Sequence, residues 1–381
     1  MSAPPQHKSV VSSSGLLNKD FALPPAQTGA EIAILPEKPV VDWATTFKGV
    51  LQGLGAKVIE GNDCVTANTQ GILWVDHGPK NVPILEKALQ VGTSVKWVQL
   101  PMSGINAYAA VVKRYPHLIW TSAKGAYAQP VAEHALTLTL ALLRHIPLRV
   151  RADCWGPMLG YSLFNRRVLI IGAGGISLSL LSLLSPFTPR VTLFRRRATE
   201  QLDLSELPMT DEARSLVDVQ GLSKLHENLP QADVVIIAAA LTADTHHVIG
   251  ERELGLMKST AVLVNIARGE HIDTPALIKA LREGQIAGAG LDVVEGEPIG
   301  DDHPLWNVDS SHNDVAGTNS GMWGPVKKGG EGRANLIVTP HTADTLDMVL
   351  PLFTRRFTQN AQALMSGDGS FEGVVDAEHG Y

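Results

Sequence analysis

The stretch RVLIIGAGGIS, residues 167–177, gives the clearest indication of the fold of this chain. An aliphatic, strand-like run ends at Gly172, and a helical pattern follows from Gly175. Glycines at 172 and 174 permit a tight turn and a close approach of the backbone to a pyrophosphate, and the helix N-terminus offers free N–H donors. Ser177 stands at the usual third glycine position and is small enough for close helix–strand packing. We therefore predict a dinucleotide-binding β–turn–α unit that uses Gly172 and Gly174.

A series of strand-like runs follows this unit, separated by helical or turn-rich segments. Such alternation is typical of a doubly wound parallel sheet, so we predict a Rossmann dinucleotide-binding domain over residues 126–344. The runs are RVTLF (190–194), ADVVIIAAA (232–240), AVLVNIA (261–267), IAGAGLDV (286–293) and NLIVTP (335–340).

The first part of the chain shows the same α/β alternation. It predicts a flavodoxin-like, doubly wound substrate domain over residues 30–125, to which residues 345–381 return. The preceding residues, 1–29, are rich in Ser and Pro and carry few charges, so we expect a disordered or loosely docked tail there. A helix with Pro130 in its first turn is expected over 129–146, largely buried because it is apolar all round. The expected strands are 31–35, 56–60, 71–75, 95–100 and 117–120, and the expected helices are 42–54 and 82–90.

Composition excludes several classes of protein. The 381 residues carry a net charge of −6, and the basic runs are too short to form a nucleic-acid face. The apolar runs fall short of the roughly 20 residues that a membrane helix needs, and the first 28 residues lack the apolar core of a secretory signal. The two cysteines, Cys64 and Cys154, match no metal or redox spacing, so we predict no metal site and a reducing, cytoplasmic location.

Three arginines follow the second strand of the dinucleotide-binding series, as FRRR over residues 194–197. NAD-selective folds usually place an Asp or Glu at the position of Arg195, where it holds the ribose 2′-hydroxyl. An arginine removes that anion and offers a fork suited to a 2′-phosphate. We therefore predict that Arg195 and Arg196 favour NADP(H), with NAD(H) as the alternative.

A guanidinium, a carboxylate and an imidazole follow three predicted strands: Arg268 in NIARG, Glu297 in VVEGEP and His341 in TPH. The carboxyl edge of a parallel sheet is where α/β folds bind ligands. Arg268 can bind the carboxylate and carbonyl oxygen of a 2-oxo acid and polarise the carbonyl. A His–Glu pair keeps the imidazole protonated and oriented, so His341 can donate the proton in reduction and accept it in oxidation. We predict these three as the catalytic residues of a dehydrogenase.

The chain resembles the D-isomer-specific 2-hydroxyacid dehydrogenase family, and its arginine-bearing loop is similar to the glyoxylate/hydroxypyruvate reductase branch. The resemblance covers roughly residues 95–365, and the first domain matches only in pattern. The motifs that carry it are GAGGI (172–176), AALTADTHHVIG (239–250), LVNIARGEHIDTPALIKAL (263–281), AGLDVVEGEPIGDDHPLW (289–306) and TPH (339–341).

The resemblance implies roles for further residues. Ser103 and Gly104 would hold the substrate carboxylate together with Arg268. The remaining positions would bind the cofactor: Gly175 and Ile176 at the pyrophosphate, Ala240, Thr242 and Thr245 along the adenosine side, and Ala267 and Asp292 near the nicotinamide. We also expect a homodimer, and we expect the reducing direction if NADPH is the partner, because that cofactor usually serves reduction.

The segment between Glu297 and His341 departs from the family, since it is much longer than usual. The excess, roughly residues 307–334, is polar and glycine-rich and predicts an extended loop. It enters the amino end of the last strand, about 16 Å from His341 for five residues of strand, so we expect a role in assembly or stability.

Two alternatives to this function remain open. One is a dinucleotide-sensing binding protein that resembles the C-terminal-binding corepressors, which keep the same trio. The other is a related dehydrogenase that acts on another acid, such as phosphoglycerate or formate. Oxidation of NADPH with a panel of 2-oxo acids separates these from the predicted enzyme.

Overall fold

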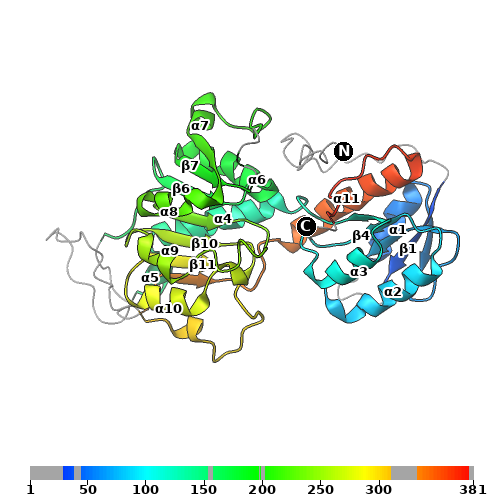
Figure 1. The fold of residues 1–381 in the computed structure, drawn as a ribbon, viewed down its shortest axis with the longest axis horizontal. Helices are drawn as coiled ribbons and strands as arrows, with labels where there is room; N and C mark the ends of the chain where they lie inside the picture. The colour runs from blue at the N-terminus through cyan, green and yellow to red at the C-terminus, as the bar shows by residue number, and fades with distance from the viewer. Residues whose placement is uncertain are drawn as a thin grey trace. The chain divides into compact units, whose positions relative to one another are not determined.

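The computed structural model describes residues 29–37, 44–152, 158–196, 198, 202–309 and 333–376. It divides into two compact units (Figure 1). Unit 1 holds the described residues up to Tyr127 and those from Thr345 onward, and unit 2 runs from Ala128 to Asp344. The tail expected over residues 1–29 lies outside the described residues except for Gly29.

Unit 1 is built on a five-stranded parallel sheet in the order β2-β1-β3-β4-β5. This order is that of a flavodoxin-like fold, and it confirms the predicted class of the first domain. Its strands are β1 (Glu31–Leu35), β2 (Lys57–Glu60), β3 (Thr69–Trp74), β4 (Trp97–Gln99) and β5 (Ile119–Thr121).

Helices cover both faces of the unit 1 sheet (Figure 1). On one face Phe47 of α1 meets Phe353 and Phe357 of α11 edge to face, with ring centroids 5.5 and 4.8 Å apart. On the other face the apolar residues of α2 and α3 pack against β1, β3 and β4, because aliphatic side chains recur on one side of each helix. The helices are α1 (Ala44–Gly53), α2 (Val82–Val91), α3 (Ala109–Arg114) and α11 (Leu346–Ser366).

The C-terminal segment, residues 371–376, is fastened along the edge strand β5. The Ser122 N–H donates to the Gly373 carbonyl over 2.8 Å, and the Val375 N–H donates to the Trp120 carbonyl over 2.9 Å. The segment therefore supplies partners to an edge that parallel pairing leaves open.

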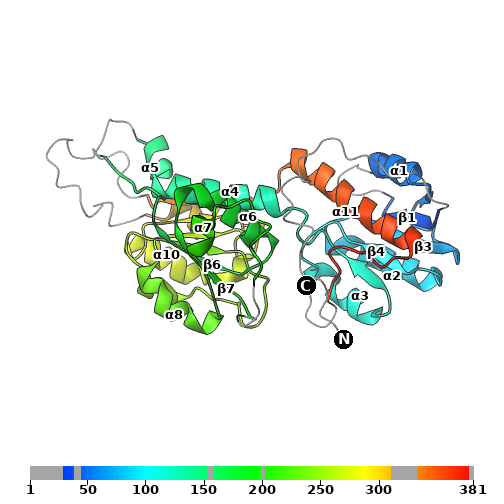
Figure 2. The same ribbon diagram turned by 90° about the horizontal axis from the view of Figure 1, so that it is seen from above.

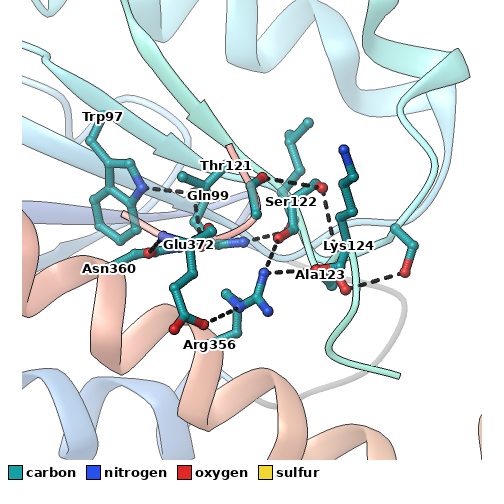
Figure 3. A network of polar contacts seen from close by, with 12 residues as sticks. Trp97, Gln99, Thr121, Ser122, Ala123, Lys124, Arg356, Asn360 and Glu372 are labelled. Atoms are coloured by element: carbon teal, nitrogen blue, oxygen red, sulfur yellow. Dashed lines mark hydrogen bonds and ion pairs between the residues drawn. The ribbon is translucent and has the colours of Figure 1, made fainter. Parts of the chain in front are cut away.

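Two buried polar side chains of α11 hold this segment in place (Figure 3). The Arg356 guanidinium donates to the Lys124 carbonyl over 2.8 Å and lies 3.5 Å from the Glu372 carboxylate. The Asn360 amide donates to Gln99 Oε1 over 2.7 Å and to the Glu372 carbonyl over 3.0 Å. The last described residues thus belong to the polar core of unit 1.

Unit 2 is built on a seven-stranded parallel sheet in the order β12-β11-β10-β9-β6-β7-β8, and this order confirms the predicted Rossmann fold. The sequence analysis missed β8, a largely half-exposed edge strand whose VDVQ pattern is too short and polar to stand out. The strands are β6 (Arg167–Ile171), β7 (Arg190–Phe194), β8 (Val217–Gln220), β9 (Val234–Ile237), β10 (Val262–Asn265), β11 (Gly288–Leu291) and β12 (Leu336–Val338).

The core of unit 2 lies on both faces of this sheet. One face packs against α8, α9 and α10, and α4 crosses the other face so closely that a Cβ at Gly290 would lie 3.1 Å from Leu138 (Figure 2). The helices are α4 (Ala128–Leu143), α5 (Ile146–Val150), α6 (Gly175–Leu184), α7 (Asp211–Ser215), α8 (Leu225–Asn228), α9 (Glu251–Leu256) and α10 (Thr274–Arg282).

The long helix expected over 129–146 ends earlier, at Leu143. Pro147 explains the difference, because its ring clashes with the carbonyl four residues before it and cannot continue the helix. His145 takes a left-handed conformation, with φ of 51°, and α5 begins after it. None of the helices in the described ranges is long and apolar enough to span a membrane.

Most of the long segment between Glu297 and His341, residues 310–332, lies outside the described residues. Its two ends meet, since Asp309 and Arg333 form an antiparallel bridge and the Ala334 N–H donates to the Val308 carbonyl over 2.9 Å. Next to this base, the Asn335 amide donates to the Ala287 carbonyl, just before β11 begins. The two described ends of the segment therefore lie next to the amino ends of β11 and β12.

Candidate active site

Three neighbouring strands of unit 2 carry the predicted catalytic residues. Arg268 follows β10, Glu297 follows β11 and His341 follows β12. These strands are parallel and hydrogen-bonded in the order β10-β11-β12. Because the carboxyl ends of parallel strands share one edge of a sheet, all three residues leave the sheet on the same side.

His341 and Glu297 form a direct pair. His341 Nδ1 lies 2.6 Å from Glu297 Oε1, and the Val294 N–H donates to Glu297 Oε2 over 3.1 Å. The side chains are 47% and 37% exposed, so the pair is open to small molecules. Among the described residues, His341 Nε2 has no hydrogen-bond partner. The carboxylate thus orients the ring and leaves its second nitrogen available for proton exchange.

The backbone at His341 is strained. Its φ of 54° lies in the left-handed region, which is unfavourable for a residue with a Cβ. The His341 N–H donates to the Asp292 carbonyl over 2.8 Å. Strain of this kind persists only where surrounding contacts enforce it, and it is common at functional sites.

Asp292 anchors the turn that carries His341. Its buried carboxylate accepts hydrogen bonds from the Thr339 hydroxyl over 2.6 Å, the Thr342 N–H over 3.0 Å and the Ala343 N–H over 3.1 Å. His134 of α4 adds a contact to the Thr339 hydroxyl over 3.0 Å. Asp292 therefore positions the turn that carries His341, and the sequence analysis assigned no role to Thr339 or His134.

Two side chains hold the Arg268 loop. The Asn265 amide donates to the Arg268 carbonyl over 2.8 Å, and its oxygen accepts the Ala267 N–H over 3.1 Å. His271 Nδ1 lies 2.9 Å from the same Arg268 carbonyl. The sequence analysis missed both, although an Asn at the end of a strand is a common signal for a side chain that closes a turn.

The Arg268 guanidinium lies close to its own backbone. Its Nη1 donates to the Ala267 carbonyl over 2.6 Å. Among the described residues it forms no ion pair with a carboxylate. A half-buried guanidinium that no protein anion neutralises is suited to bind an anionic ligand.

The Arg268 and Glu297 loops touch each other through Gly269. A Cβ at Gly269 would lie 2.1 Å from the Val294 carbonyl carbon and 2.2 Å from the Glu295 nitrogen. Only glycine allows this approach, and it ties the loops after β10 and β11 together.

The glycine turn between β6 and α6 has the features expected of a pyrophosphate site. Gly172 has φ of 113°, and a Cβ there would lie 2.4 Å from the Ala238 carbonyl oxygen. Gly174 precedes α6, Gly175 and Ile176 begin it, and no side chain caps its end. The Ser177 hydroxyl, at the third glycine position, donates to the Gly172 carbonyl over 2.9 Å. The turn follows the carboxyl end of β6, next to β9. At this pair of strands the strand order reverses, and α/β sheets bind ligands at such a point.

Other predicted cofactor residues follow β7 and β9, the two strands next to β6 in the sheet. The half-buried Arg195 and the exposed Arg196 follow β7, next to β6. Thr242 and Thr245 lie in the loop after β9, where the Thr245 hydroxyl donates to the Ala240 carbonyl over 2.8 Å and accepts the Thr242 N–H over 2.8 Å. Their positions match the ends of neighbouring strands.

The predicted substrate loop belongs to unit 1. Ser103 and Gly104 follow β4, at the carboxyl end of the unit 1 sheet. The Ser103 hydroxyl donates to the Ala123 carbonyl over 3.2 Å, and the Ala123 N–H donates to the Met102 carbonyl over 2.9 Å. These bonds fix the loop within its own unit.

A family model described as D-isomer specific 2-hydroxyacid dehydrogenase, NAD binding domain, matches residues 136–313. An uncharacterised protein of the proB 3′ region of Corynebacterium melassecola is 32% identical over 298 residues, which are 76% of this chain and 84% of that protein. A glyoxylate reductase of Pyrococcus horikoshii is 38% identical over 179 residues, 44% of this chain and 50% of the reductase. The chain thus aligns with about half the length of that enzyme.

Solved structures share the fold. A D-isomer specific 2-hydroxyacid dehydrogenase of Xanthobacter autotrophicus, in complex with NADPH and MES, superimposes with a TM-score of 0.69 at 22% identity, over 93% of this chain and 100% of that one. The NAD-complexed form of one from Lactobacillus delbrueckii gives a TM-score of 0.64 at 24% identity, over 91% and 100% of the two chains.

Proposed function

The chain belongs to the D-isomer specific 2-hydroxyacid dehydrogenase family, a family of NAD(P)-dependent oxidoreductases acting on CH–OH groups, and on that premise we propose that it reduces a 2-oxo acid to a D-2-hydroxy acid with NADPH. Small 2-oxo acids such as glyoxylate and hydroxypyruvate are the proposed substrates. The similarity to the glyoxylate reductase of Pyrococcus horikoshii supports this choice.

The His341–Glu297 pair carries the proposal. Glu297 holds Nδ1 of the ring over 2.6 Å, which leaves Nε2 to donate a proton to the carbonyl oxygen in reduction and to remove it from the hydroxyl in oxidation.

Arg268 is the proposed anchor for the substrate. Its guanidinium, which has no carboxylate partner among the described residues, would bind the substrate carboxylate and polarise the carbonyl group. Ser103 and Gly104 are proposed to bind the same carboxylate through their backbone N–H groups, as the family resemblance implies.

The glycine turn fits a dinucleotide, because Gly172 lets the backbone come close and the uncapped N-terminus of α6 can receive a pyrophosphate. When bound, the nicotinamide supplies the hydride. Gly174, Gly175 and Ile176 would contact the phosphates, and Ala240, Thr242 and Thr245 the adenosine. Ala267 and Asp292 are proposed to lie near the nicotinamide.

The proposed preference for NADPH depends on Arg195 and Arg196. The absence of an acidic side chain at the end of β7 and the presence of two guanidinium groups favour a 2′-phosphate over a free 2′-hydroxyl. The reducing direction follows from this preference, because NADPH usually serves reduction.

The test is a kinetic screen of glyoxylate, hydroxypyruvate and bulkier 2-oxo acids with NADPH and NADH at matched concentrations. We expect turnover of small acids with NADPH, and a loss of kcat by a factor of about 100 or more in His341→Gln. Arg268→Ala should raise KM and lower kcat together. Cofactor binding without turnover of any acid would favour a dinucleotide-sensing protein instead.

A homodimer is proposed for the assembly. Four exposed apolar side chains lie near one another in the sequence, in and after α5: Ile146 is 46% exposed, Val150 79%, Met158 74% and Phe164 55%. Such a group is typical of a surface that another chain covers. Sedimentation should give twice the chain mass, and Val150→Glu should shift it toward the monomer. Val91→Glu, at an exposed apolar position in unit 1, is the matched control.

A cytoplasmic location is proposed as well. Only two cysteines occur in 381 residues, which suits a reducing compartment. Fractionation of the source cells tests it.

A further inference from the structure

Two histidines and a glutamate gather in unit 2 outside the catalytic trio. His246 and His247 lie in the loop between β9 and α9, and Glu295 lies in the loop after β11. One ligand atom of each side chain, an imidazole nitrogen or a carboxylate oxygen, lies within 4.8 Å of the other two. The fold thus brings three possible metal-ligand atoms together from residues nearly 50 positions apart in the chain.

The fold holds His247 and Glu295 in place. His247 has a left-handed backbone, with φ of 48°, and its N–H donates to the Glu270 carbonyl over 2.8 Å. Its Nε2 lies 2.8 Å from Glu295 Oε1. The contact of Gly269 with the backbone of Glu295 fixes the second loop. Two of the three donors are therefore positioned by the backbone before any ligand binds.

His246 adds the third donor from an exposed position. Its ring stacks on that of His247, with centroids 4.1 Å apart and planes at 29°. Burial raises the pKa of Glu295, but the hydrogen bonds from His247 and Thr274 outweigh burial and lower it, so this carboxylate is ionised near neutral pH. The cluster thus combines one anion with two imidazoles.

In contrast to the prediction of no metal site made from the sequence, we propose that His246, His247 and Glu295 form a binding site for a divalent transition-metal ion of the Zn²⁺ class. Two imidazole nitrogens and one carboxylate oxygen are a common ligand set for such ions, with a fourth position left to water. Bonds of about 2.0–2.2 Å in tetrahedral geometry separate the ligand atoms by roughly 3.3 Å. The ion would replace the proton between His247 and Glu295, with a small opening of that pair and a rotation of the His246 ring.

Unit 2 also contains a histidine–glutamate ion pair without a third possible ligand, and this pair can be compared with the cluster. His226 Nε2 lies 2.6 Å from Glu253 Oε1, and no third ligand from the described residues joins them. An ion pair needs one histidine, whereas the cluster offers two. His226 is therefore the natural control for metal binding.

The site would join two loops of the candidate active site. The loop with His246 and His247 also carries Thr242 and Thr245, and Glu295 lies two positions before Glu297. Since the ion binds only when these loops meet, it should stabilise the folded unit 2.

The experiment is calorimetric titration of the full chain, without a histidine tag, with Zn²⁺, together with absorption spectra of the Co²⁺ complex. We expect one ion per chain and a rise in Tm with Zn²⁺ concentration. His246→Ala, His247→Ala and Glu295→Gln should each weaken binding about tenfold or more, since even outer partners of a metal contribute that much. His226→Ala should bind as the unchanged chain does.

His246→Ala is the decisive variant, because the exposed His246 side chain makes only the stacking contact among the described residues and its loss leaves the fold intact. An unchanged Tm of the metal-free variant checks this. Absence of saturable binding at one ion per chain would overturn the proposal. So would binding that survives His246→Ala but is lost in His341→Gln, because the ion would then lie at the catalytic pair. No turnover is measured, so the outcome is independent of the proposed reductase activity.

Discussion

The main-chain N–H of His341 donates to the carbonyl oxygen of Asp292 over 2.8 Å. The Asp292 carboxylate then binds the Thr342 and Ala343 N–H groups that follow. Asp292 thus holds the strained left-handed turn at His341 through both its main-chain carbonyl and its carboxylate. The exposed His–Glu pair can keep its geometry because hydrogen bonds to the buried Asp292 fix the turn that carries His341.

Asp292→Ala should destabilise unit 2 by about 2–4 kcal/mol, because three donors, of which the Ala343 N–H is buried, lose their acceptor. Denaturant unfolding measures this, with Asp301→Ala, at an exposed position, as a control that should stay within about 0.5 kcal/mol of the unchanged chain. A loss below about 1 kcal/mol in Asp292→Ala would mean that water replaces the carboxylate.

Arg195→Asp should move the cofactor preference toward NADH. An anion at the end of β7 repels the 2′-phosphate and can accept the 2′-hydroxyl, so we expect KM for NADPH to rise about tenfold or more and KM for NADH to fall. Steady-state kinetics with both cofactors measure the ratio. Arg190→Asp, at the other end of β7, should leave it unchanged. An unaltered ratio in Arg195→Asp would refute the role assigned to Arg195.

Glu31 should make the stability of unit 1 depend on pH in the acid range. The hydrogen bond from Lys57, at 2.7 Å, and then that from Thr66 lower the pKa of its carboxyl group. A carboxyl whose folded pKa is lowered contributes stability above its unfolded pKa of about 4.3, and this is lost as pH falls through the folded value. Glu31→Gln should be less stable at neutral pH, and its stability should fall less steeply in acid. Parallel acid-unfolding curves for the two proteins would contradict this.

Arg356→Met should destabilise unit 1 by about 3 kcal/mol, because the Lys124 carbonyl loses its donor and the Glu372 carboxylate its cation. Residues 371–376 should then detach from β5, so limited proteolysis should cut near the C-terminus before the rest of the chain. Arg355→Met, at the neighbouring position of α11, is the matched control. Equal cleavage rates in both variants would show that Arg356 does not hold the segment.

Replacing residues 310–332 by a short turn should leave kcat and KM near those of the full chain. The segment starts at the bridge between Asp309 and Arg333, next to the amino ends of β11 and β12, whereas His341 follows the carboxyl end of β12. We expect changes in Tm or oligomeric state instead, measured by calorimetry and sedimentation. A variant that keeps its fold and assembly but loses activity would refute this.

Much of the fold could be predicted because buried parallel strands are short apolar runs between turn residues. The runs at 31–35, 167–171 and 262–265 needed no further information. The edge strand β8 was not predicted, because half-exposed residues need not be apolar and so give no apolar run in the sequence. The early end of α4 is an error in the other direction: the apolar content continues to Ile146, but His145 is left-handed and Pro147 cannot continue the helix.

The candidate site was predictable where a residue type alone implies chemistry, as with Arg268, Glu297 and His341. The residues that hold these side chains in place could not be predicted. Asn265, Thr339 and His134 acquire their roles only through partners on other strands and helices.

The two parallel sheets, the glycine turn and the strand ends that carry the trio could all be predicted, because they follow from local pattern and from the shared edge of parallel strands. Which atoms meet became apparent only from the folded chain. The 2.6 Å pair of His341 with Glu297, the anchoring of its turn by Asp292 and the cluster of His246, His247 and Glu295 all join loops from different strands. Side-chain contact depends on how such loops pack, and no local pattern along the chain encodes it.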